Sequence, residues 1–196
     1  MKRTVLEDIL MQEDVVKSIR ENYDVLIDII PEVKDMVGFD HKHPHHHLDV
    51  FEHTLLALSR APHDFEIRLV LLLHDIGKPH SCQEGEVRHF KGHPLVSCKM
   101  AKVILKRLNF SDEERERICY LIKEHDSLIS EEDIKENFDL VYKRFKIQFC
   151  DGLAHHPDKL EKRIKYLLEM NSKINKDEEK EDYEKKLNGL LRSNNR

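Results

Sequence analysis

The sequence predicts an all-α protein, folded as a single compact bundle of roughly seven to nine helices. The chain of 196 residues has only six Gly and six Pro, so it is poor in the residues that form turns between short strands. Apolar residues recur at steps of three and four positions along most of the chain, which is the spacing of one helix face. Charged residues make up 36% of the chain, which is typical of a helical surface exposed to water.

The first half of the chain divides at proline and glycine. Pro31 ends the first apolar repeat, because proline lacks a backbone donor and clashes with the preceding helical turn. Asp64 is suited to cap a helix that ends before Gly77. Gly77 is expected to adopt the left-handed conformation that ends a helix, and Pro79 prevents its continuation. The helices expected here cover residues 4–30, 48–60 and 65–76, with loops over 38–47 and 77–92.

The second half begins its helices with recognisable capping signals. Pro94 suits the first turn of a helix whose N-cap region is His93. Ser111 and Ser130 each stand three residues before an acidic residue, a pattern that starts helices. The segment after about residue 172 is rich in Lys, Glu and Asp, so it is either a weak helix or a solvated, partly disordered tail. The remaining helices are expected over 94–108, 112–125, a short stretch after 130, 139–154 and a region around 160–168.

The length allows one domain with a substantial core. We divide it into an N-terminal helical segment over 1–37 that packs on the core, a central core over 38–155, and a C-terminal amphipathic helix with a charged tail over 156–196. The four cysteines form no C-x-x-C pair, which favours reduced thiols. No apolar run is long enough for a signal peptide or a membrane span. We therefore expect a cytoplasmic protein without a membrane partner.

The net charge and the histidine content limit the classes of function that the sequence favours. The formal net charge is −5, whereas a protein that binds nucleic acid mainly through phosphates is usually basic. The chain contains fourteen histidines, several of them between His41 and His47. Lys42 and Pro44 interrupt that cluster, so it does not resemble an affinity tag.

Several helices place His or Asp on a face that is otherwise apolar. An unpartnered polar group costs about 1–3 kcal/mol when buried, so such residues usually converge on a common partner. A single histidine of this kind is more often a satisfied core residue, but four positions in different helices favour a metal site. The residues are His53, His74, His125 and Asp151.

The adjacent pair His74-Asp75 strengthens the case for a metal. The pair lies in the last turn before Gly77. A helix carries partial negative charge at its C-terminus, which favours a nearby cation.

These residues resemble an ordered family pattern. His53, the run HDIGK at 74–78, His93, His125 and Asp151 are similar to the H…HD…H…H…D pattern of the HD superfamily of metal-dependent phosphohydrolases. The segments at 48–58, 69–79, 89–108 and 121–126 resemble the HD module of bacterial tRNA nucleotidyltransferases. Nothing in residues 1–37 resembles the catalytic carboxylates of the nucleotidyltransferase head. The resemblance therefore implies an HD-domain bundle without CCA-adding activity.

The resemblance also implies a set of metal ligands and a choice of metals. The set is large enough for two ions, and two is the preferred interpretation over one. Mixed nitrogen and oxygen ligands suit Fe, Mn, Ni, Co or Zn. Asp75 would bridge the two ions. The first ion would be held by His53, His74, Asp75 and Asp151, and the second by Asp75, His93 and His125.

Further residues are assigned to substrate by the same resemblance or by position. Lys78 would face the substrate phosphate and act with Asp75 in catalysis, the alternative being a solvated lysine past a helix end. His47 is a candidate substrate contact because it shortly precedes His53. Arg68 either pairs with a carboxylate near the site or lies on the outer face of its helix. A basic stripe either guides an anionic substrate or RNA, or is a solvated helix face, which is the preferred interpretation; it comprises Lys99, Lys102, Lys106 and Arg107.

The predicted function is that of a metal-dependent phosphohydrolase. It would act as a phosphomonoesterase or phosphodiesterase on a nucleotide or an RNA-end phosphate, through a metal-activated hydroxide. The expected partner is a small phosphorylated substrate, a nucleotide in preference to RNA. One alternative is an HD-fold module that binds a nucleotide or RNA without turnover. Another is a scaffold that pairs through its charged C-terminal helix.

Overall fold

The computed structural model describes residues 1–40, 42, 48–155, 160–175 and 177–194, and it confirms the all-α class. These residues form twelve α-helices and one 3-10 helix, η1, with no strand among them. Ten of the α-helices have at least seven residues, so the prediction of seven to nine helices was too low. The bounds are α1 Lys2–Leu10, α2 Val15–Glu21, α3 Tyr23–Ile29, η1 Pro31–Met36, α4 Val50–Leu58, α5 Phe65–Leu73, α6 Lys78–Ser81, α7 His93–Arg107, α8 Asp112–Lys123, α9 Glu131–Glu136, α10 Phe138–Gly152, α11 Leu160–Ile174 and α12 Asp177–Asn194.

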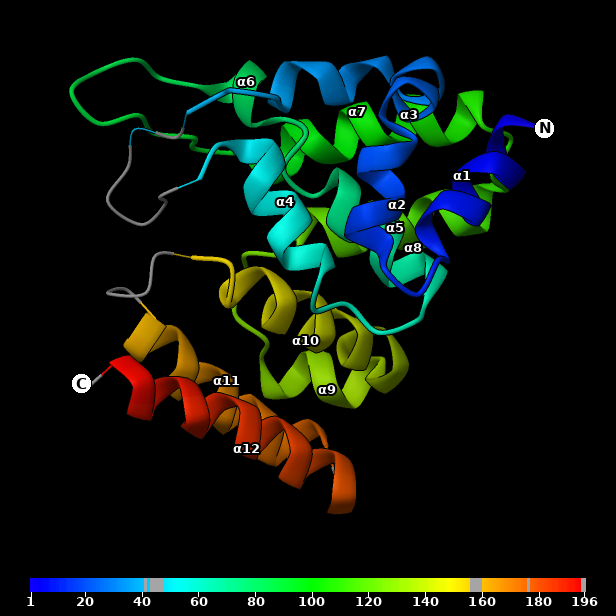
Figure 1. Ribbon diagram of the computed structural model, residues 1–196. Helices are drawn as coiled ribbons and strands as arrows, with labels where there is room; N and C mark the ends of the chain where they lie inside the picture. The colour runs from blue at the N-terminus through cyan, green and yellow to red at the C-terminus, as the bar shows by residue number, and fades with distance from the viewer. Residues whose placement is uncertain (41, 43–47, 156–159, 176, 195–196) are drawn as a thin grey trace.

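The single helix predicted over 4–30 is three helices. Asp14 caps α2, because its side chain accepts a hydrogen bond of 2.9 Å from the Lys17 backbone N–H. Asn22 ends α2 and stands before the first residue of α3. The apolar spacing runs across both breaks because all three helices bury their apolar faces in the same core. The apolar periodicity therefore reflects the shared core. It does not predict where the chain changes direction between the three helices, which Figure 1 shows.

Helix α5 lies in the middle of the bundle. Every residue from Glu66 to Leu73 is buried, and α1, α4, α8 and α10 pack around this helix. A helix that is buried on all sides needs such a complete cover. The arrangement brings the ends of several helices to the C-terminal end of α5, where the run HDIGK begins.

The turn after α5 differs from the prediction. Helix α5 ends at Leu73, residues 74–77 form a turn, and the short α6 occupies part of the segment predicted as a loop. Gly77 has φ −85° and is not left-handed. Glycine is required there for a different reason: a Cβ at this position would overlap the backbone of Ser97 and lie 2.8 Å from its Oγ. The Gly77 N–H donates to that Oγ at 2.9 Å, which fixes α7 against the turn.

Arg68 is neither paired with a site carboxylate nor on an outer face. Its side chain is buried and donates to the carbonyls of Leu10 at 2.6 Å and Gln12 at 2.8 Å. These are backbone acceptors at the C-terminal end of α1, which a cation stabilises. Arg68 therefore joins the N-terminal helices to α5.

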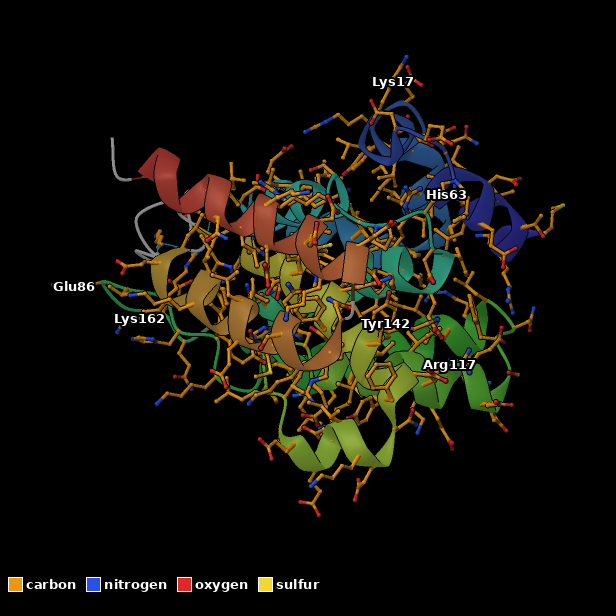
Figure 2. All side chains as sticks on the ribbon, turned by 90° about the horizontal axis from the view of Figure 1, so that it is seen from below. Lys17, His63, Glu86, Arg117, Tyr142 and Lys162 are labelled. Carbon is orange, nitrogen blue, oxygen red and sulfur yellow. The ribbon has the colours of Figure 1, made fainter. Side chains whose placement is uncertain are left out.

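The C-terminal segment is a folded helix over its described residues. In Figure 1, α11 and α12 run antiparallel beneath α10, and Figure 2 shows the same pair from below. The ring of Tyr183 on α12 meets the rings of Phe145 and Phe149 on α10 at 5.3 and 4.7 Å between centroids, and Leu187 is fully buried. Of the two interpretations of the tail, the helix is correct. No helix among the described residues is long and apolar enough to span a membrane.

Candidate metal centre

The structure brings all six predicted metal ligands together in one buried cluster. They come from four helices and the turn after α5, and the most exposed of them, His93, has only 8% of its surface accessible. Helices α4 and α10 each supply one residue from within the helix, α7 supplies its first residue, and α8 supplies the second residue after its end. His53 lies in α4 and Asp151 in α10. His93 is the first residue of α7, and His125 follows the end of α8. His74 and Asp75 come from the turn after α5.

The carboxylate of Asp75 stands between two groups of histidines. Its Oδ2 lies 3.3 Å from Nε2 of His74 and 3.6 Å from Nε2 of His53. Its Oδ1 lies 3.2 Å from Nε2 of His93 and 3.9 Å from Nε2 of His125. Each group, with Asp75, offers three ligand atoms that lie within 4.8 Å of one another. The cluster thus has two candidate ion positions that share one carboxylate.

Asp151 faces the first of these positions. Its Oδ1 lies 2.9 Å from Nε2 of His53 and 3.5 Å from Nε2 of His74. The ring nitrogens and both carboxylates therefore converge on the same small volume.

Main-chain carbonyls orient every histidine of the cluster in the same way. The carbonyl acceptors are Ala154 for His53 at 3.2 Å, Leu71 for His74 at 2.6 Å, Phe90 for His93 at 3.0 Å and Ile122 for His125 at 2.7 Å. A carbonyl can only accept, so each Nδ1 carries a proton. In the neutral ring Nε2 is then a lone-pair donor, and all four Nε2 atoms face the centre. This arrangement is how proteins orient metal-binding imidazoles.

His93 and His125 face one another through their Nε2 atoms. Their Nε2 atoms are 3.3 Å apart, and both rings hold their Nδ1 proton toward a carbonyl. Burial lowers the pKa of His125 to about 4, so its ring is neutral near pH 7. A cation placed beside both Nε2 atoms would be bound by both rings.

The buried carboxylates of the cluster and His74 shift one another's pKa values toward the charged forms. Burial acts to lower the pKa of His74, but Asp75 and Asp151 outweigh it and raise that pKa to about 10. Burial acts to raise the pKa of Asp75, but His74 and Lys78 hold it well below the usual range. The carboxylates thus remain charged, with His74 and Lys78 as cationic groups beside them.

Unsatisfied atoms at the centre fit a divalent ion. Among the described residues, His74 Nε2 and both oxygens of Asp75 are buried and have no hydrogen-bond partner, although Lys78 Nζ lies 2.6 Å from Asp75 Oδ2 as an ion pair. Buried groups left in this state cost about 1–3 kcal/mol each. Imidazole nitrogen and carboxylate oxygen are together the donors of Fe, Mn, Ni, Co or Zn sites. The described residues therefore form a cluster able to hold metal ions.

A cavity of about 380 Å³ adjoins the cluster. Asp75, His125 and Asp151 form its polar floor, and the loop before α7 forms its wall through Arg88, His89, Phe90 and Lys91. Lys78 also lines it, with its ammonium 5.9 Å from the centre of the Phe90 ring. A pocket of this size accommodates a small ligand such as a nucleotide.

Three residues next to the cluster were not predicted from the sequence. Arg163 on α11 donates to Asp151 Oδ2 at 3.4 Å. His155 donates its Nδ1–H to the Asp151 carbonyl at 3.1 Å and lines the cavity. Asp126 has Oδ2 3.6 Å from His93 Nε2. The adjacency of Asp126 to His125 was a usable signal, whereas nothing local marked Arg163. The predicted contact His47, with most of the His41–His47 cluster, lies outside the described residues.

Comparison with known proteins places these observations in a family. Residues 45–169 match the HD domain, which is more than half of the chain. This chain belongs to the HD-domain family. The HD match covers all six of the predicted ligands and the helices that position them, which are α4, α5, α7, α8 and α10.

Three curated relatives share the HD region at lower coverage. The CC-adding tRNA nucleotidyltransferase of Thermus thermophilus is 36% identical over 53% of this chain and 25% of its own length. The A-adding tRNA nucleotidyltransferase of Deinococcus radiodurans is 36% identical over 51% of this chain and 25% of its own. The multifunctional CCA protein of Shewanella denitrificans is 27% identical over 55% and 27%. The chain thus matches about a quarter of each relative's length, which bears out the resemblance to the HD region of these enzymes.

Proposed function

We propose that this protein is a metal-dependent phosphohydrolase that acts on a nucleotide or on the terminal phosphate of an RNA. One observation carries the proposal: a buried His and Asp cluster with two groups of ligand atoms, sharing Asp75, forms the floor of a cavity with cationic walls. The HD domain provides the family context. The roles assigned to individual residues are part of the proposal.

The proposed ligands divide between two divalent ions. His53, His74 and Asp151 would hold the first, His93 and His125 the second, and Asp75 would contribute one oxygen to each. When bound, such ions act as Lewis acids that make water a nucleophile near neutral pH and offset charge on phosphoryl oxygens. The distances of both Asp75 oxygens to separate histidines support the shared role.

The protein's own residues would bind and orient the phosphate. Lys78 is buried beside Asp75 with its ammonium at the cavity, where a point charge suits a phosphoryl oxygen. Arg88 and Lys91 add positive charge at the wall. The N-terminus of α7, at Gly92 and His93, also opens on the cavity, and its partial positive charge favours an anion. Phe90 provides the one aromatic wall among the lining residues, which suits a base or a sugar.

The choice of a nucleotide or RNA end has a separate support. The relatives are named for adding nucleotides to tRNA, so their HD regions belong to proteins that handle RNA ends. The described part of this chain shares that region with them.

The test is replacement of Asp75 by Ala and by Asn, with Mn, Ni or Fe supplied in turn. We expect hydrolysis of phosphomonoesters or 2′,3′-cyclic nucleotides by the wild type, and a loss of at least about a hundredfold in both variants because both ions lose their shared ligand. The matched control is Asp139→Asn, an exposed carboxylate at the start of α10, which should retain full activity. Unchanged turnover in Asp75→Ala would overturn the proposal. Tight metal binding without hydrolysis of any phosphate ester would instead support the binding module.

A further inference from the structure

The segment that begins at the cavity wall is strongly asymmetric in charge. Residues 87–111 contain no Asp or Glu, although the whole protein carries a formal net charge of −5. The same 25 positions hold six cationic side chains, which are Arg88, Lys91, Lys99, Lys102, Lys106 and Arg107. Such a separation of charge produces a local positive potential on a protein that is acidic overall.

Three of these lysines form one exposed line on α7. Lys99, Lys102 and Lys106 are exposed, while Ser97, Ala101 and Ile104 on the same helix are buried. At about 100° per residue, the three lysines fall within one narrow arc opposite the buried face. We call Lys91, Lys99, Lys102 and Lys106 the lysine stripe.

The lysine stripe lacks the carboxylate partners that other lysines of the protein have. Over the described residues, no carboxylate oxygen lies within 4 Å of any of its four ammonium groups, whereas Lys165, Lys173 and Lys186 each pair with an acid one helical turn earlier. The two arginines of the segment are also paired, Arg88 with Glu84 and Arg107 with Glu32. The stripe therefore retains its full charge toward solvent.

The stripe extends further from the cavity than a mononucleotide can reach. Lys91 lines the cavity, and α7 leads away from it, as Figure 1 shows. At 1.5 Å per residue, Lys99 and Lys106 lie roughly 10 and 20 Å along the helix axis from His93. A ligand that touches both the cluster and Lys106 must be an extended chain with several anionic groups.

We propose that the lysine stripe is a docking surface for single-stranded RNA, whose terminal nucleotide enters the cavity. This inference rests on the proposed function and names the polymer form of its substrate. The cavity of about 380 Å³ holds about one nucleotide, which suits the end of a single strand and not a duplex. Helix α7 carries no Phe, Tyr or Trp, and its exposed lysines suit contacts to phosphates in preference to stacked bases. Binding along the stripe is accordingly independent of base sequence.

The binding test compares two triple charge reversals of equal net change. The stripe variant is Lys99→Glu, Lys102→Glu and Lys106→Glu, and the control is Lys17→Glu, Lys135→Glu and Lys185→Glu, all exposed lysines on other helices. Glu86 marks the tip of the loop before α7, and Lys17 lies far from it (Figure 2). Affinity is measured by fluorescence anisotropy with a labelled RNA dodecamer in chelator, so that no hydrolysis competes.

We expect the stripe variant to bind the dodecamer at least about tenfold more weakly, and the control to stay within about threefold of the wild type. Loss of three phosphate contacts should also lower the slope of log affinity against log salt by about 2. A DNA dodecamer should bind with similar affinity, because phosphate contacts do not read the sugar. Equal RNA affinity in both triple variants would overturn the docking surface, as would stripe-dependent binding of anionic vesicles or polyglutamate without binding of RNA.

A second measurement separates this inference from the proposed function. The stripe variant keeps the whole metal centre, so it should hydrolyse p-nitrophenyl phosphate esters at the wild-type rate while its rate on an RNA-end phosphate at low concentration falls about tenfold. Wild-type rates on both substrates would overturn the docking surface and leave the hydrolase standing. Absence of metal-dependent hydrolysis in the wild type, with stripe-dependent RNA binding retained, would overturn the hydrolase alone.

Discussion

At the scale of single residues, the hydrogen-bond partners of the candidate ligands determine how the candidate site is organised. Three of the histidines hold their Nδ1 proton toward a carbonyl three residues earlier in the chain, as His74 does with Leu71. The fold of the backbone thus selects the tautomer and aims each Nε2 at the centre. Asp75 has a local partner in Lys78, three residues later, whereas Asp151 obtains one from Arg163 on another helix.

Arg163 should therefore control the affinity of the centre for metal. Replacement by Gln removes the charge that holds Asp151 Oδ2, and loss of a partner of this kind typically weakens metal binding about 10- to 100-fold. Competition with a chelating dye measures the affinity directly. Lys162→Gln, at the exposed neighbouring position, is the control. Equal metal affinity in the two variants would show that Asp151 does not depend on the guanidinium.

At the scale of elements, local caps and close approaches decide where helices begin and how near they come. The Ser111 and Ser130 capping boxes are formed as predicted, and Asp64 caps α5. Gly77 instead acts through contact, because α7 lies directly against it.

Alanine substitutions at two glycines should have opposite effects on the free energy of unfolding. Gly77→Ala forces a Cβ into the backbone and side chain of Ser97 and should lower stability by about 1–3 kcal/mol, as overpacking does. Gly189→Ala places its Cβ in open space on α12 and should raise stability by about 0.5–1 kcal/mol through backbone entropy. Urea unfolding of both variants provides the comparison. A Gly77→Ala protein as stable as the wild type would show that α7 can move away from the turn.

The ion pair between α1 and α8 should make stability depend on pH in the acid range. The hydrogen bond from Arg3, followed by that from the Ser111 backbone, lowers the pKa of Glu114 from 4.5 to about 2. A carboxyl whose pKa is lower in the folded state stabilises the fold above its unfolded pKa, and this contribution is lost as pH falls through about 2.

Glu114→Gln should thus lower the free energy of unfolding by about 1 kcal/mol at pH 7, since the pair is partly exposed to solvent. The difference from the wild type should shrink below pH 4.5 and vanish near pH 2, as measured by chemical unfolding across that range. Glu113→Gln, an exposed position in the same turn, should change stability by less than about 0.5 kcal/mol at every pH. A Glu114→Gln deficit that does not change with pH would contradict the ion-pair explanation.

At the scale of the whole molecule, the C-terminal pair α11 and α12 is continuous with the core. Arg163 reaches the metal centre from α11, and α12 covers the aromatic rings of α10. The charged composition of α12 reflects its solvent face, while its few apolar residues complete the core.

Leu187→Ala measures how firmly α12 is attached. Its side chain is fully buried, so truncation should lower the free energy of unfolding by about 2–5 kcal/mol. Leu128→Ala, at a side chain 72% exposed, should change it by less than about 0.5 kcal/mol. Equal stability of the two variants would mean that α12 separates from the bundle in solution.

The sequence by itself determined the helical class, most helix starts and the membership of the candidate centre. Caps are local, because the side chain and the backbone N–H it accepts from are three residues apart in Asp64, Ser111 and Ser130. The candidate ligands could be recognised for a related reason: a His or Asp on an apolar helix face is anomalous whatever the rest of the fold. Their type and order could then be matched to a family without knowing any distance between them.

Only the tertiary structure decided how those residues act together. It set the two oxygens of Asp75 against different histidines, brought Arg163 to Asp151, and gave Gly77 a role in packing in place of the left-handed turn. Over the described residues it also left the lysines of α7 without a carboxylate partner. Each of these facts depends on contacts between helices distant in the chain, and no short-range pattern of caps or periodicity encodes which helices meet. The pair His74-Asp75 marked the candidate site in the sequence, and the bundle around α5 placed it between two groups of residues that could hold a metal ion.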